Sequence, residues 1–474
     1  MALTFNQDRS DTIAAAATAM SEAGIGIIRL SGDRAIEIGS EIYINGKKEH
    51  SLSSHASGTI RFGYIVDGDT LIDEVMVSVM RSPHSYTTED TVEINTHGGI
   101  YIMHRVLDLV LKKGARMAEP GEFTRRAFLG GRIDLARAEA VMDLIGSRNE
   151  FARKNSLAQL QGAVSDIVRD LRARILYEIA FIESALDDPD SYDLEGYPER
   201  LDTVCREVIS RLRDLTDHAD EGRLLQDGIP TVIVGKPNAG KSSLMNHMAG
   251  EDLAIVTDVA GTTRDTLRES VRLSGILLNL TDTAGIRDTL DKVERIGIQR
   301  TMEAVEKAQL VLFLIDASTP VTSEDREIAQ VLTGRMKEGA SCIVLLNKND
   351  LEVLTREEDV RALFPEDCLP AFLSCSLATG QGLEDLSRLV EDLFHTGEIM
   401  QREEVYLTNL RHKEAAREAL EAMELVERSI EDGMSEDFFS IDLMTAYTAL
   451  GRILGEAVED DLVEEIFSRF CLGK

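Results

Sequence analysis

Residues 1–130 alternate short β-branched and apolar runs with turns, a pattern typical of short strands. Four of these runs are candidate strands: Gly26–Gly32, Thr59–Tyr64, Glu74–Val79 and Thr91–Ile94. The spacing changes from Gly99 to Lys113, where apolar residues recur at helical intervals. The pattern predicts a small N-terminal α+β domain over residues 1–130.

Residues 131–227 have a helical pattern instead. One apolar residue in every three or four forms a single stripe: Leu157, Leu160, Val164, Ile167, Leu171, Ile175, Ile179, Ile182 and Leu186. The stripe predicts one helix of about thirty residues, roughly 45 Å long. A second long helix is expected from about Pro198 to Ala219. Helices of this length should pack against each other or against further helices.

Strands and helices alternate over residues 228–395, which predicts a mostly parallel sheet with helices on both faces. The buried-strand candidates are Thr231–Val234, Leu277–Leu280, Leu310–Ile315, Cys342–Leu346 and Ala371–Ser374. Residues 396–474 are helical again and end in Cys471-Leu472-Gly473-Lys474. The α/β domain is therefore expected to be inserted into one helical domain, whose two parts are residues 131–227 and 396–474.

Composition and charge narrow the class of protein. The 474 residues carry a net charge of −33, which argues against broad, non-specific nucleic-acid binding but leaves room for a local basic patch. We find neither a run of about 18 apolar residues nor a secretory signal. Five scattered cysteines without C-x-x-C spacing are typical of reduced thiols. We therefore expect a cytoplasmic protein with no membrane partner.

The stretch Gly235-Lys236-Pro237-Asn238-Ala239-Gly240-Lys241-Ser242 fits the phosphate-loop pattern G-x-x-x-x-G-K-[ST]. An apolar strand precedes it and a helical pattern beginning at Ser243 follows it, which is the context that a phosphate loop requires. The backbone N–H groups of such a loop turn toward one anion. Lys241 would reach the β- and γ-phosphates, and the Ser242 hydroxyl would bind Mg²⁺.

Three further loops complete the pattern of a GTP site. The first is Asp258-Val259-Ala260-Gly261-Thr262-Thr263-Arg264-Asp265, in which we expect Thr263 to bind Mg²⁺. The second is Asp282-Thr283-Ala284-Gly285, in which Asp282 would hold Mg²⁺ through water and Gly285 would sense the γ-phosphate. The third contains Asn347 and Lys348, which would brace the loop and the base, and Asp350. The Asp350 carboxylate would accept two hydrogen bonds that guanine can donate and adenine cannot. Ser376-Leu377-Ala378 occupies the place of a second guanine-contact loop, where a backbone N–H would serve. These loops predict a chain that binds and hydrolyses GTP.

The predicted hydrolysis mechanism departs from the common one. Ile286 stands where many GTPases place the glutamine that orients water. Asn238 could instead help bind a monovalent cation, with backbone oxygens of Thr257, Val259 and Thr262 completing the cage, and K⁺ there would supply the charge of an arginine finger. Glu294 could hold the water. The alternatives are that Asn238 only shapes the loop and that Glu294 is a solvated carboxylate on a helix.

Four segments occur together in this chain: the phosphate loop, Asp-Thr-Ala-Gly-Ile-Arg, Val-Glu-Arg-Ile-Gly and the ending Phe470-Cys471-Leu472-Gly473-Lys474. In these segments the sequence resembles the bacterial tRNA-modification GTPase family MnmE, also called TrmE. Thr91–Gly99 and Pro120–Phe128 are similar to the family's N-terminal domain. The resemblance covers essentially the whole chain.

The resemblance implies a homodimer formed through the N-terminal domains and K⁺-dependent GTP hydrolysis as two G domains meet. It also implies a complex with the flavoprotein MnmG that adds an aminomethyl-type group to carbon 5 of the tRNA wobble uridine. A one-carbon folate, 5-formyl- or methylene-tetrahydrofolate, would bind the N-terminal domain at Arg29, Glu93, Arg132 and Lys474. Ala17–Ser21 lacks the two prolines and the glycine expected there, so the entry loop is expected to differ.

Two features of the sequence have alternative explanations. Cys471, near Arg469 and Lys474, is either a nucleophile or redox thiol, or part of a tail that only shapes the folate site. Basic residues cluster between positions 112 and 137: Lys112, Lys113, Arg116, Arg125, Arg126, Arg132 and Arg137. They form either a contact surface for tRNA or MnmG or a solvated face.

Two other functions compete with a tRNA-modification GTPase. The first is a GTP-controlled assembly switch that binds ribosomes, although no G-x-x-G RNA-clamp loop in a βα context follows residue 395. The second is a folate-binding scaffold whose G domain only sets conformation.

Overall fold

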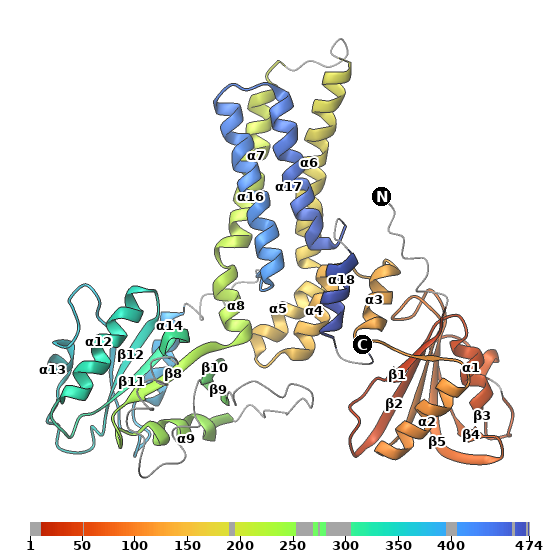
Figure 1. Ribbon diagram of the computed structural model, residues 1–474, viewed down its shortest axis with the longest axis horizontal. Helices are drawn as coiled ribbons and strands as arrows, with labels where there is room; N and C mark the ends of the chain where they lie inside the picture. The colour runs from red at the N-terminus through yellow and green to blue at the C-terminus, as the bar shows by residue number, and fades with distance from the viewer. Residues whose placement is uncertain are drawn as a thin grey trace. The chain divides into compact units, whose positions relative to one another are not determined.

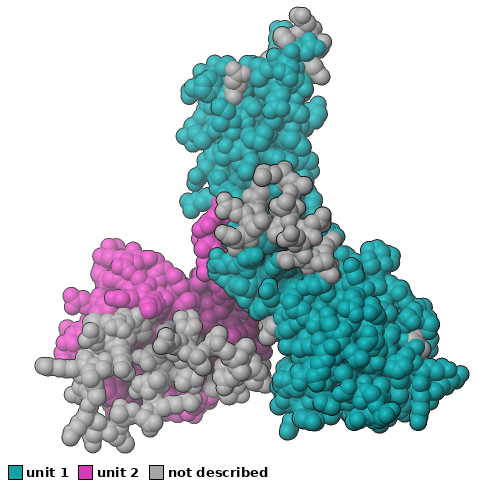
Figure 2. Space-filling view, turned by 45° about the vertical axis from the view of Figure 1, so that its right-hand side comes forward, with its two compact units in different colours: residues 1–145, 158–209, 415–474 teal, residues 146–157, 210–414 magenta. Residues whose placement is uncertain are grey.

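The structure is a computed structural model that describes residues 11–50, 52–188, 195–252, 269–273, 275–280, 305–394, 405–456, 460–470 and 473 (Figure 1). The chain divides into two compact units (Figure 2). One consists of Met1–Ile145, Ala158–Ile209 and Ala415–Lys474, and the other of Gly146–Leu157 and Ser210–Glu414. The chain therefore leaves the first unit and returns to it, as an inserted domain requires.

In the first unit, the described residues near the N-terminus form a seven-stranded sheet in the order β3-β4-β5-β6-β2-β1-β7. Its strands are β1 (Ile13–Ala16), β2 (Ala23–Ser31), β3 (Tyr43–Ile44), β4 (Thr59–Asp67), β5 (Thr70–Met80), β6 (Thr91–Gly98) and β7 (Arg116–Met117). Neighbouring strands are antiparallel, except that β1 and β7 are parallel. The four predicted strands correspond to β2, β4, β5 and β6.

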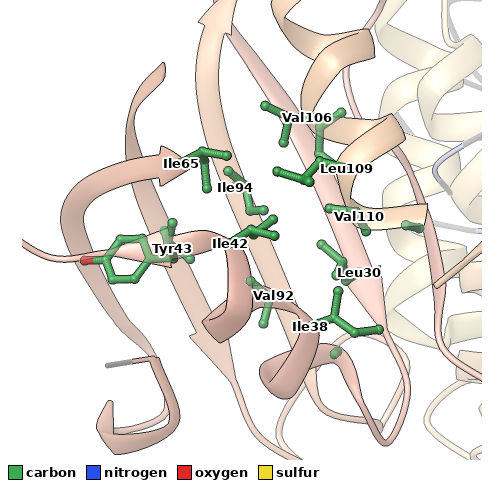
Figure 3. Close-up of a cluster of buried hydrophobic side chains, with 14 of the residues drawn as sticks. Leu30, Ile38, Ile42, Tyr43, Ile65, Val92, Ile94, Val106, Leu109 and Val110 are labelled. Carbon is green, nitrogen blue, oxygen red and sulfur yellow. The ribbon is translucent and has the colours of Figure 1, made fainter. Parts of the chain in front are cut away.

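Two helices cover one face of this sheet, α1 (Ala35–Ile42) and α2 (Ile100–Lys112), and a short 3-10 helix (Leu52–Ser54) lies beside them. Side chains from α2, including Val106 and Val110, pack against Leu30 of β2 and Ile94 of β6 (Figure 3). Alternate residues of each strand point to this core because successive side chains of a strand point to opposite faces. The N-terminal domain is therefore the predicted α+β layer, with its second sheet face left uncovered by these helices.

The remaining helices outside the G domain are α3 (Glu122–Leu129), α4 (Leu135–Gly146), α5 (Glu150–Gln161), α6 (Ala163–Asp187), α7 (Tyr197–Asp217), α8 (Ala219–Asp227), α16 (Leu410–Glu431), α17 (Glu436–Leu454) and α18 (Asp460–Ser468). Within the first unit, α6 and α17 lie side by side. Arg206 of α7 pairs with Glu427 of α16 at 3.3 Å between Nε and Oε1. These contacts form the predicted long-helix domain from segments far apart in the sequence. No helix within the described ranges is long and apolar enough to cross a membrane.

The single helix predicted from Leu157 to Leu186 is wrong. The helix is interrupted at Gly162, which has a left-handed φ of 106°. Helix α5 therefore ends at Gln161, and α6 begins at Ala163. A side chain at position 162 would collide with the guanidinium group of Arg137. Glycine tolerates this backbone conformation at no steric cost, whereas other residues do not.

The second unit contains a six-stranded sheet among its described residues, in the order β13-β12-β11-β8-β10-β9. The strands are β8 (Ile229–Gly235), β9 (Glu269–Leu273), β10 (Ile276–Leu280), β11 (Leu310–Asp316), β12 (Ser341–Asn347) and β13 (Ala371–Ser374). All described pairings are parallel except that of β9 with β10. The helices within its described residues are α9 (Lys241–Asp252), α12 (Ser323–Lys337), α13 (Glu357–Arg361) and α14 (Leu383–Leu393).

Two hydrophobic clusters show that the helices cover both faces of this sheet. Leu244 of α9 and Leu386 of α14 belong to one cluster, and Leu332 of α12 and Val360 of α13 belong to the other. This arrangement confirms the predicted doubly covered, mostly parallel sheet. It also brings the loops at the carboxyl ends of β8, β11, β12 and β13 to the same edge, where such sheets bind ligands.

Candidate functional site

The loop between β8 and α9 has the backbone of a phosphate loop. Gly235 and Gly240 have φ values of 146° and 112°, and Asn238 has a φ of 63°. A Cβ atom at Gly235 would meet the carbonyl oxygen of Leu314, and one at Gly240 would meet Nδ2 of Asn347. Both glycines are therefore required by conformation and by space, and the exposed Asn238 adopts a conformation that asparagine tolerates better than most residues.

Lys241 lies at the start of α9 with its side chain turned into the loop. Its Nζ donates hydrogen bonds to the carbonyl oxygens of Gly235 at 2.6 Å and Lys236 at 2.8 Å. Burial lowers the pKa of Lys241 from its ordinary value. Ser242 and Ser243 follow it and are exposed at the N-terminus of the helix, where the helix dipole favours an anion.

The phosphate loop is anchored to α12 by a residue that the sequence analysis did not identify. Lys236 Nζ lies 2.8 Å from Oδ2 of Asp325, a carboxylate with no exposed surface. The same oxygen accepts hydrogen bonds from the N–H and the hydroxyl of Thr322, both at 2.9 Å. This ion pair links the second residue of the loop to the capping box of a neighbouring helix.

Asn347 connects three of the predicted loops. Its Nδ2 donates to the carbonyl oxygen of Ala239 in the phosphate loop at 2.8 Å, and its Oδ1 accepts from the N–H of Leu377 at 3.0 Å. The side chain is buried, so both bonds are shielded from water. Asn347 thus has the bracing position predicted for it, between the phosphate loop and the loop after β13.

The proposed guanine side of the site contains Asp350, Lys348 and the 376–378 loop. Oδ1 of the exposed Asp350 accepts a hydrogen bond from the buried Ser376 hydroxyl at 2.6 Å. Lys348, with a φ of 68°, places its Nζ 2.6 Å from Oδ2 of Asp316 at the end of β11. Asp316 was also missed, although it directly follows a predicted strand whose carboxyl end meets that of β12.

The structure changes one detail of the 376–378 loop. The N–H of Leu377 is bonded to Asn347, and its side chain is buried in the core cluster below the loop. This N–H therefore braces the loop, whereas Ala378 of the same loop is exposed. The apolar Leu377 side chain is explained by packing.

Several predicted site residues lie outside the described residues. They are Thr257, Asp258, Val259, Ala260, Gly261, Thr262, Thr263, Asp282, Thr283, Ala284, Gly285, Glu294, Cys471 and Lys474. Their assigned roles stay predictions.

A second group of residues meets in the first unit: the predicted Arg29, Glu93 and Arg132, together with Tyr86 and the carbonyl of Gly473, which were not predicted. We call this group the N-terminal cluster. Arg29 of β2 and Glu93 of β6 face each other in the sheet register and form an ion pair of 2.8 Å between Nε and Oε1. Arg29 Nη1 also donates to the carbonyl oxygen of Gly473 at 3.0 Å. The chain's last described residue therefore joins the two predicted residues on the sheet.

Glycines fix the approach of the C-terminal segment to the N-terminal domain. A Cβ atom at Gly473, where φ is 90°, would meet the carbonyl oxygen of Ala16. At Gly121, at the start of α3, it would meet the backbone of Phe467 and the Cβ of Phe470. The Pro-Gly-Glu-Phe segment and the end of the chain are therefore in direct contact, which sequence spacing alone does not show.

The basic set predicted between Lys112 and Arg137 is not one open basic surface. Arg126 is almost fully buried and pairs with Asp11, Glu89 and Glu122. Arg116 pairs with Asp11 and Glu122, and the other pairs are Lys113 with Glu41, Arg125 with Glu119 and Arg137 with Asp134. Asp11, Glu41 and Glu89 come from elsewhere in the chain, whereas Glu119, Glu122 and Asp134 lie within the same stretch. A tRNA or MnmG surface made of the whole set is therefore not supported.

Four described cysteines are free thiols. Burial raises the pKa of Cys205 and Cys342 to about 12 and that of Cys375 to about 11. These three thiols are protonated near neutral pH and unsuited to nucleophilic chemistry.

Comparison with known proteins covers both units. The MnmE helical domain model matches residues 135–471, and the model described as GTP-binding protein TrmE N-terminus matches residues 12–132. The tRNA modification GTPase MnmE of Lachnoclostridium phytofermentans is 49% identical over 466 residues, which cover 98% of this chain and 100% of that protein. The proteins of the same name from Enterococcus faecalis and Bacillus subtilis are each 43% identical, over 467 and 471 residues. Each alignment covers 98% of this chain, and they cover 98% and 100% of those proteins respectively.

Among solved structures, the G domain of the T. maritima FeoB iron transporter matches with 20% identity and a TM-score of 0.24. The match covers 34% of this chain and 96% of that chain. A TM-score this low supports no argument about this chain.

Proposed function

The chain belongs to the MnmE family of tRNA modification GTPases, and from this membership we propose that its GTP hydrolysis controls the modification of carbon 5 of the tRNA wobble uridine. The chain is a GTP hydrolase that acts in tRNA modification. The finer proposal is that it works with the flavoprotein MnmG and adds an aminomethyl-type group that derives from a one-carbon folate. Residues 228–395 would form the G domain, residues 131–227 and 396–474 the helical domain, and residues 1–130 the dimerisation and folate domain.

The observation that carries the GTPase part is the bracing by Asn347. Its side chain joins the phosphate loop to the loop after β13, so the loops proposed for the phosphates and for guanine are held together. The residues of the site fit a nucleotide. The Gly240 position excludes a side chain, the half-buried Lys241 turns its side chain into the loop, and the Asp350 carboxylate is exposed. Lys241 would exchange its carbonyl partners for phosphate oxygens.

The residues proposed to bind metal ions offer oxygen atoms, which suit Mg²⁺ and K⁺. Mg²⁺ would be held by the hydroxyls of Ser242 and Thr263, and K⁺ by the Asn238 side chain with backbone oxygens of Thr257, Val259 and Thr262. These cations supply positive charge near the β- and γ-phosphates, where negative charge develops during hydrolysis. The exposed Asn238 side chain supports its part of the proposal. Glu294 would hold the attacking water.

The test of this mechanism is steady-state GTP hydrolysis by the full-length protein in KCl and in NaCl at equal ionic strength. We expect a faster rate in KCl, and we expect Asn238→Ala to remove the difference while guanine-nucleotide affinity stays within about twofold of wild type. Ser243→Ala is the matched control in the same loop, because Ser243 has no proposed role in cation binding. Equal wild-type rates in the two salts, or an unchanged K⁺ preference in Asn238→Ala, would reject the cation site.

The folate proposal is supported by the N-terminal cluster. Glu93 uses Oε1 for Arg29, which leaves its second carboxylate oxygen to accept hydrogen bonds from pterin N–H groups. The carbonyl oxygen of Gly473, the residue before the proposed Lys474, accepts a hydrogen bond from Arg29 of this cluster. Cys471 would then either take part in the chemistry or shape the site.

A further inference from the structure

The phosphate loop is held from outside by a carboxylate that has no contact with solvent. Asp325, in the first turn of α12, has 0% exposed surface, and its Oδ2 lies 2.8 Å from Nζ of Lys236. Among the described residues, Lys236 is the only cation that pairs with it. Because an isolated charge is costly to bury, the ionised Asp325 requires this ammonium group to stay beside it.

Capping of α12 does not by itself explain why Asp325 is buried. Its Oδ2 accepts hydrogen bonds from the N–H and the hydroxyl of Thr322, both at 2.9 Å, which complete a capping box. A capping box needs no cation and no burial. In α13 of the same unit, the exposed Asp359 accepts the equivalent hydrogen bond from the N–H of Arg356 at 2.9 Å. The burial of Asp325 is therefore explained by its contact with Lys236 and not by the cap.

Lys236 connects this carboxylate to the main chain of the phosphate loop. Its carbonyl oxygen accepts hydrogen bonds from Nζ of Lys241 at 2.8 Å and from the N–H of Ala239 at 3.3 Å. The side chain of Lys236 is thus fixed to α12, while its backbone oxygen holds the turn of the loop. A displacement of Lys236 would therefore move both the turn and the lysine that is proposed to contact the phosphates.

Helix α12 is a rigid support for this contact because it packs on the sheet. Ala329 and Leu332, one and two turns after Asp325, are buried in the cluster formed with β11 and β12 (Figure 1). Near the other end of the helix, Arg335 donates to the carbonyl oxygen of Val305 at 3.0 Å. Asp325 is therefore fixed to the core of the domain.

We propose that Asp325 is a positioning residue for the GTP site. Through Lys236 it holds the phosphate loop in the conformation that receives the β-phosphate, without touching the nucleotide itself. The physical reason is that donors held in place before the ligand arrives lose less conformational freedom when it binds. This inference adds to the GTP hydrolase activity and is independent of the proposed folate and MnmG roles.

The test separates recognition of the β-phosphate from recognition of guanine by comparing GDP with GMP, which lacks the β-phosphate. Dissociation constants are measured on the full-length protein by competition with a fluorescent guanine nucleotide. The double variant Lys236→Met with Asp325→Asn removes both charges and leaves no unpaired charge buried, so we expect it to fold. We expect it to reduce the preference for GDP over GMP about tenfold and to keep the affinity for GMP within about twofold of wild type.

Two single variants are the controls for this measurement. Lys236→Arg keeps a positive charge beside Asp325 and should keep the preference for GDP within about twofold of wild type. Glu338→Gln removes the exposed partner of Arg335 near the other end of α12 and should change neither affinity. Melting temperatures show whether each variant is folded.

The positioning role is wrong if a folded double variant keeps the wild-type preference for GDP, or if it loses affinity for GDP and GMP equally. An unfolded double variant would make the ion pair a requirement of folding and would also overturn the proposal. If wild type itself binds GMP as tightly as GDP, the assignment of the phosphate loop is wrong, and this inference with it.

Discussion

The pair formed by Asp316 and Lys348 controls the geometry of one loop next to the proposed guanine site. Asp316 Oδ2 lies 2.6 Å from Lys348 Nζ, and Oδ1 accepts from the N–H and hydroxyl of Ser318 at 3.0 and 2.6 Å. Burial raises the pKa of Asp316, but the hydrogen bonds from Lys348 and Ser318 outweigh it and hold this pKa below its usual range. The Asp316 carboxylate is therefore charged near neutral pH and fixes the position of the Lys348 ammonium group.

We expect Asp316→Asn to weaken GDP binding by about tenfold, or about 1.4 kcal/mol, because Lys348 would lose its fixed orientation. The measurement is the Kd of a fluorescent GDP analogue. Ser318→Ala, which removes one hydrogen bond to Asp316 but keeps its charge, should have a smaller effect. Since an indirect effect through misfolding would also lower the melting temperature, an unchanged melting temperature is part of the expected result. Unchanged GDP affinity in Asp316→Asn would show that the pair does not position Lys348.

At the scale of single residues, the sequence identifies residues that belong to a motif but not the partners that they contact from distant parts of the chain. Asn347 was predicted to brace its loop because it follows a buried strand in a recognisable pattern, and its two hydrogen bonds agree with that role. Asp325 and Tyr86 were not predicted, because each acts on a residue far away in the sequence. Only the folded chain brings Asp325 to Lys236 and Tyr86 to Arg132.

At the scale of elements, α3 is tied to the N-terminal sheet by charged residues. Arg126 on α3 has 2% exposure and pairs with Glu122 one turn earlier, with Glu89 before β6 and with Asp11 before β1. Burial raises the pKa values of Asp11 and Glu122, but hydrogen bonds from Arg116 and Arg126 lower them by more. The helix is thus attached by a network in which Asp11 and Glu122 are ionised near neutral pH.

This network predicts a specific dependence of stability on pH. A carboxyl group whose pKa is depressed by folding stabilises the protein above its unfolded pKa, about 4, and this contribution is lost as the pH falls through the lower folded pKa. We expect Glu122→Gln to destabilise the N-terminal domain by about 2 kcal/mol at pH 7 and to remove part of its acid sensitivity below about pH 4.

The difference is measured by hydrogen exchange of peptides from β1 and β2 in the full-length protein, with variant and wild type compared at each pH. Asp69→Asn, in the exposed turn between β4 and β5, is the control and should change little. A difference between Glu122→Gln and wild type that stays constant from pH 7 to about pH 3 would mean that the ionised carboxylate is not what stabilises α3.

Element positions were predictable where strands are buried on both faces and less so where a helix breaks. The strands β8, β10, β11 and β12 contain the predicted apolar runs because their burial in the sheet requires continuous apolar sequence. The edge strand β13 also contains its predicted run, although its residues are only partly buried or exposed. The break at Gly162 was missed because apolar residues continue at helical spacing on both sides of it. Leu157 and Leu160 are only partly buried on α5, and Leu186 is exposed at the end of α6, so the stripe was not one buried face.

At the scale of the whole molecule, the uncovered face of the N-terminal sheet supports the proposed homodimer. Ile60 and Phe62 of β4 and Met76 of β5 are 58%, 48% and 45% exposed, and Phe62 pairs directly with Met76 across the two strands. Helices α1 and α2 cover the other face, as the core in Figure 3 shows. Adjacent exposed apolar side chains on a sheet are typical of an interaction surface.

We therefore expect Phe62→Glu to shift the protein from dimer to monomer at micromolar concentration, because it would place a charge in the apolar centre of the interface. The measurement is light scattering coupled to size-exclusion chromatography. Leu71→Glu, another exposed apolar residue on β5 with 60% exposure, tests whether any charge on this domain has the same effect. A wild-type monomer, or a Phe62→Glu dimer, would contradict the assignment of this face.

The relation between the two units is tested by a variant that stops the G domain without touching the N-terminal cluster. Lys241 lies in the phosphate loop of the second unit, and Arg29 and Glu93 lie in the first. We expect Lys241→Ala to reduce GTP hydrolysis at least a hundredfold and to abolish tRNA modification, while binding of 5-formyl-tetrahydrofolate stays within about twofold of wild type. Modification is measured by mass spectrometry of wobble nucleosides from cells in which the variant replaces the wild-type protein.

The three measurements on Lys241→Ala together separate the competing functions. If hydrolysis is lost but modification continues, the chain is a folate-binding scaffold whose G domain only sets conformation. If modification also continues in cells from which the whole protein is deleted, the result favours the alternative of a ribosome-assembly switch. Joint loss of hydrolysis and modification, with folate binding intact, would mean that the nucleotide site in one unit controls chemistry whose folate cofactor binds in the other.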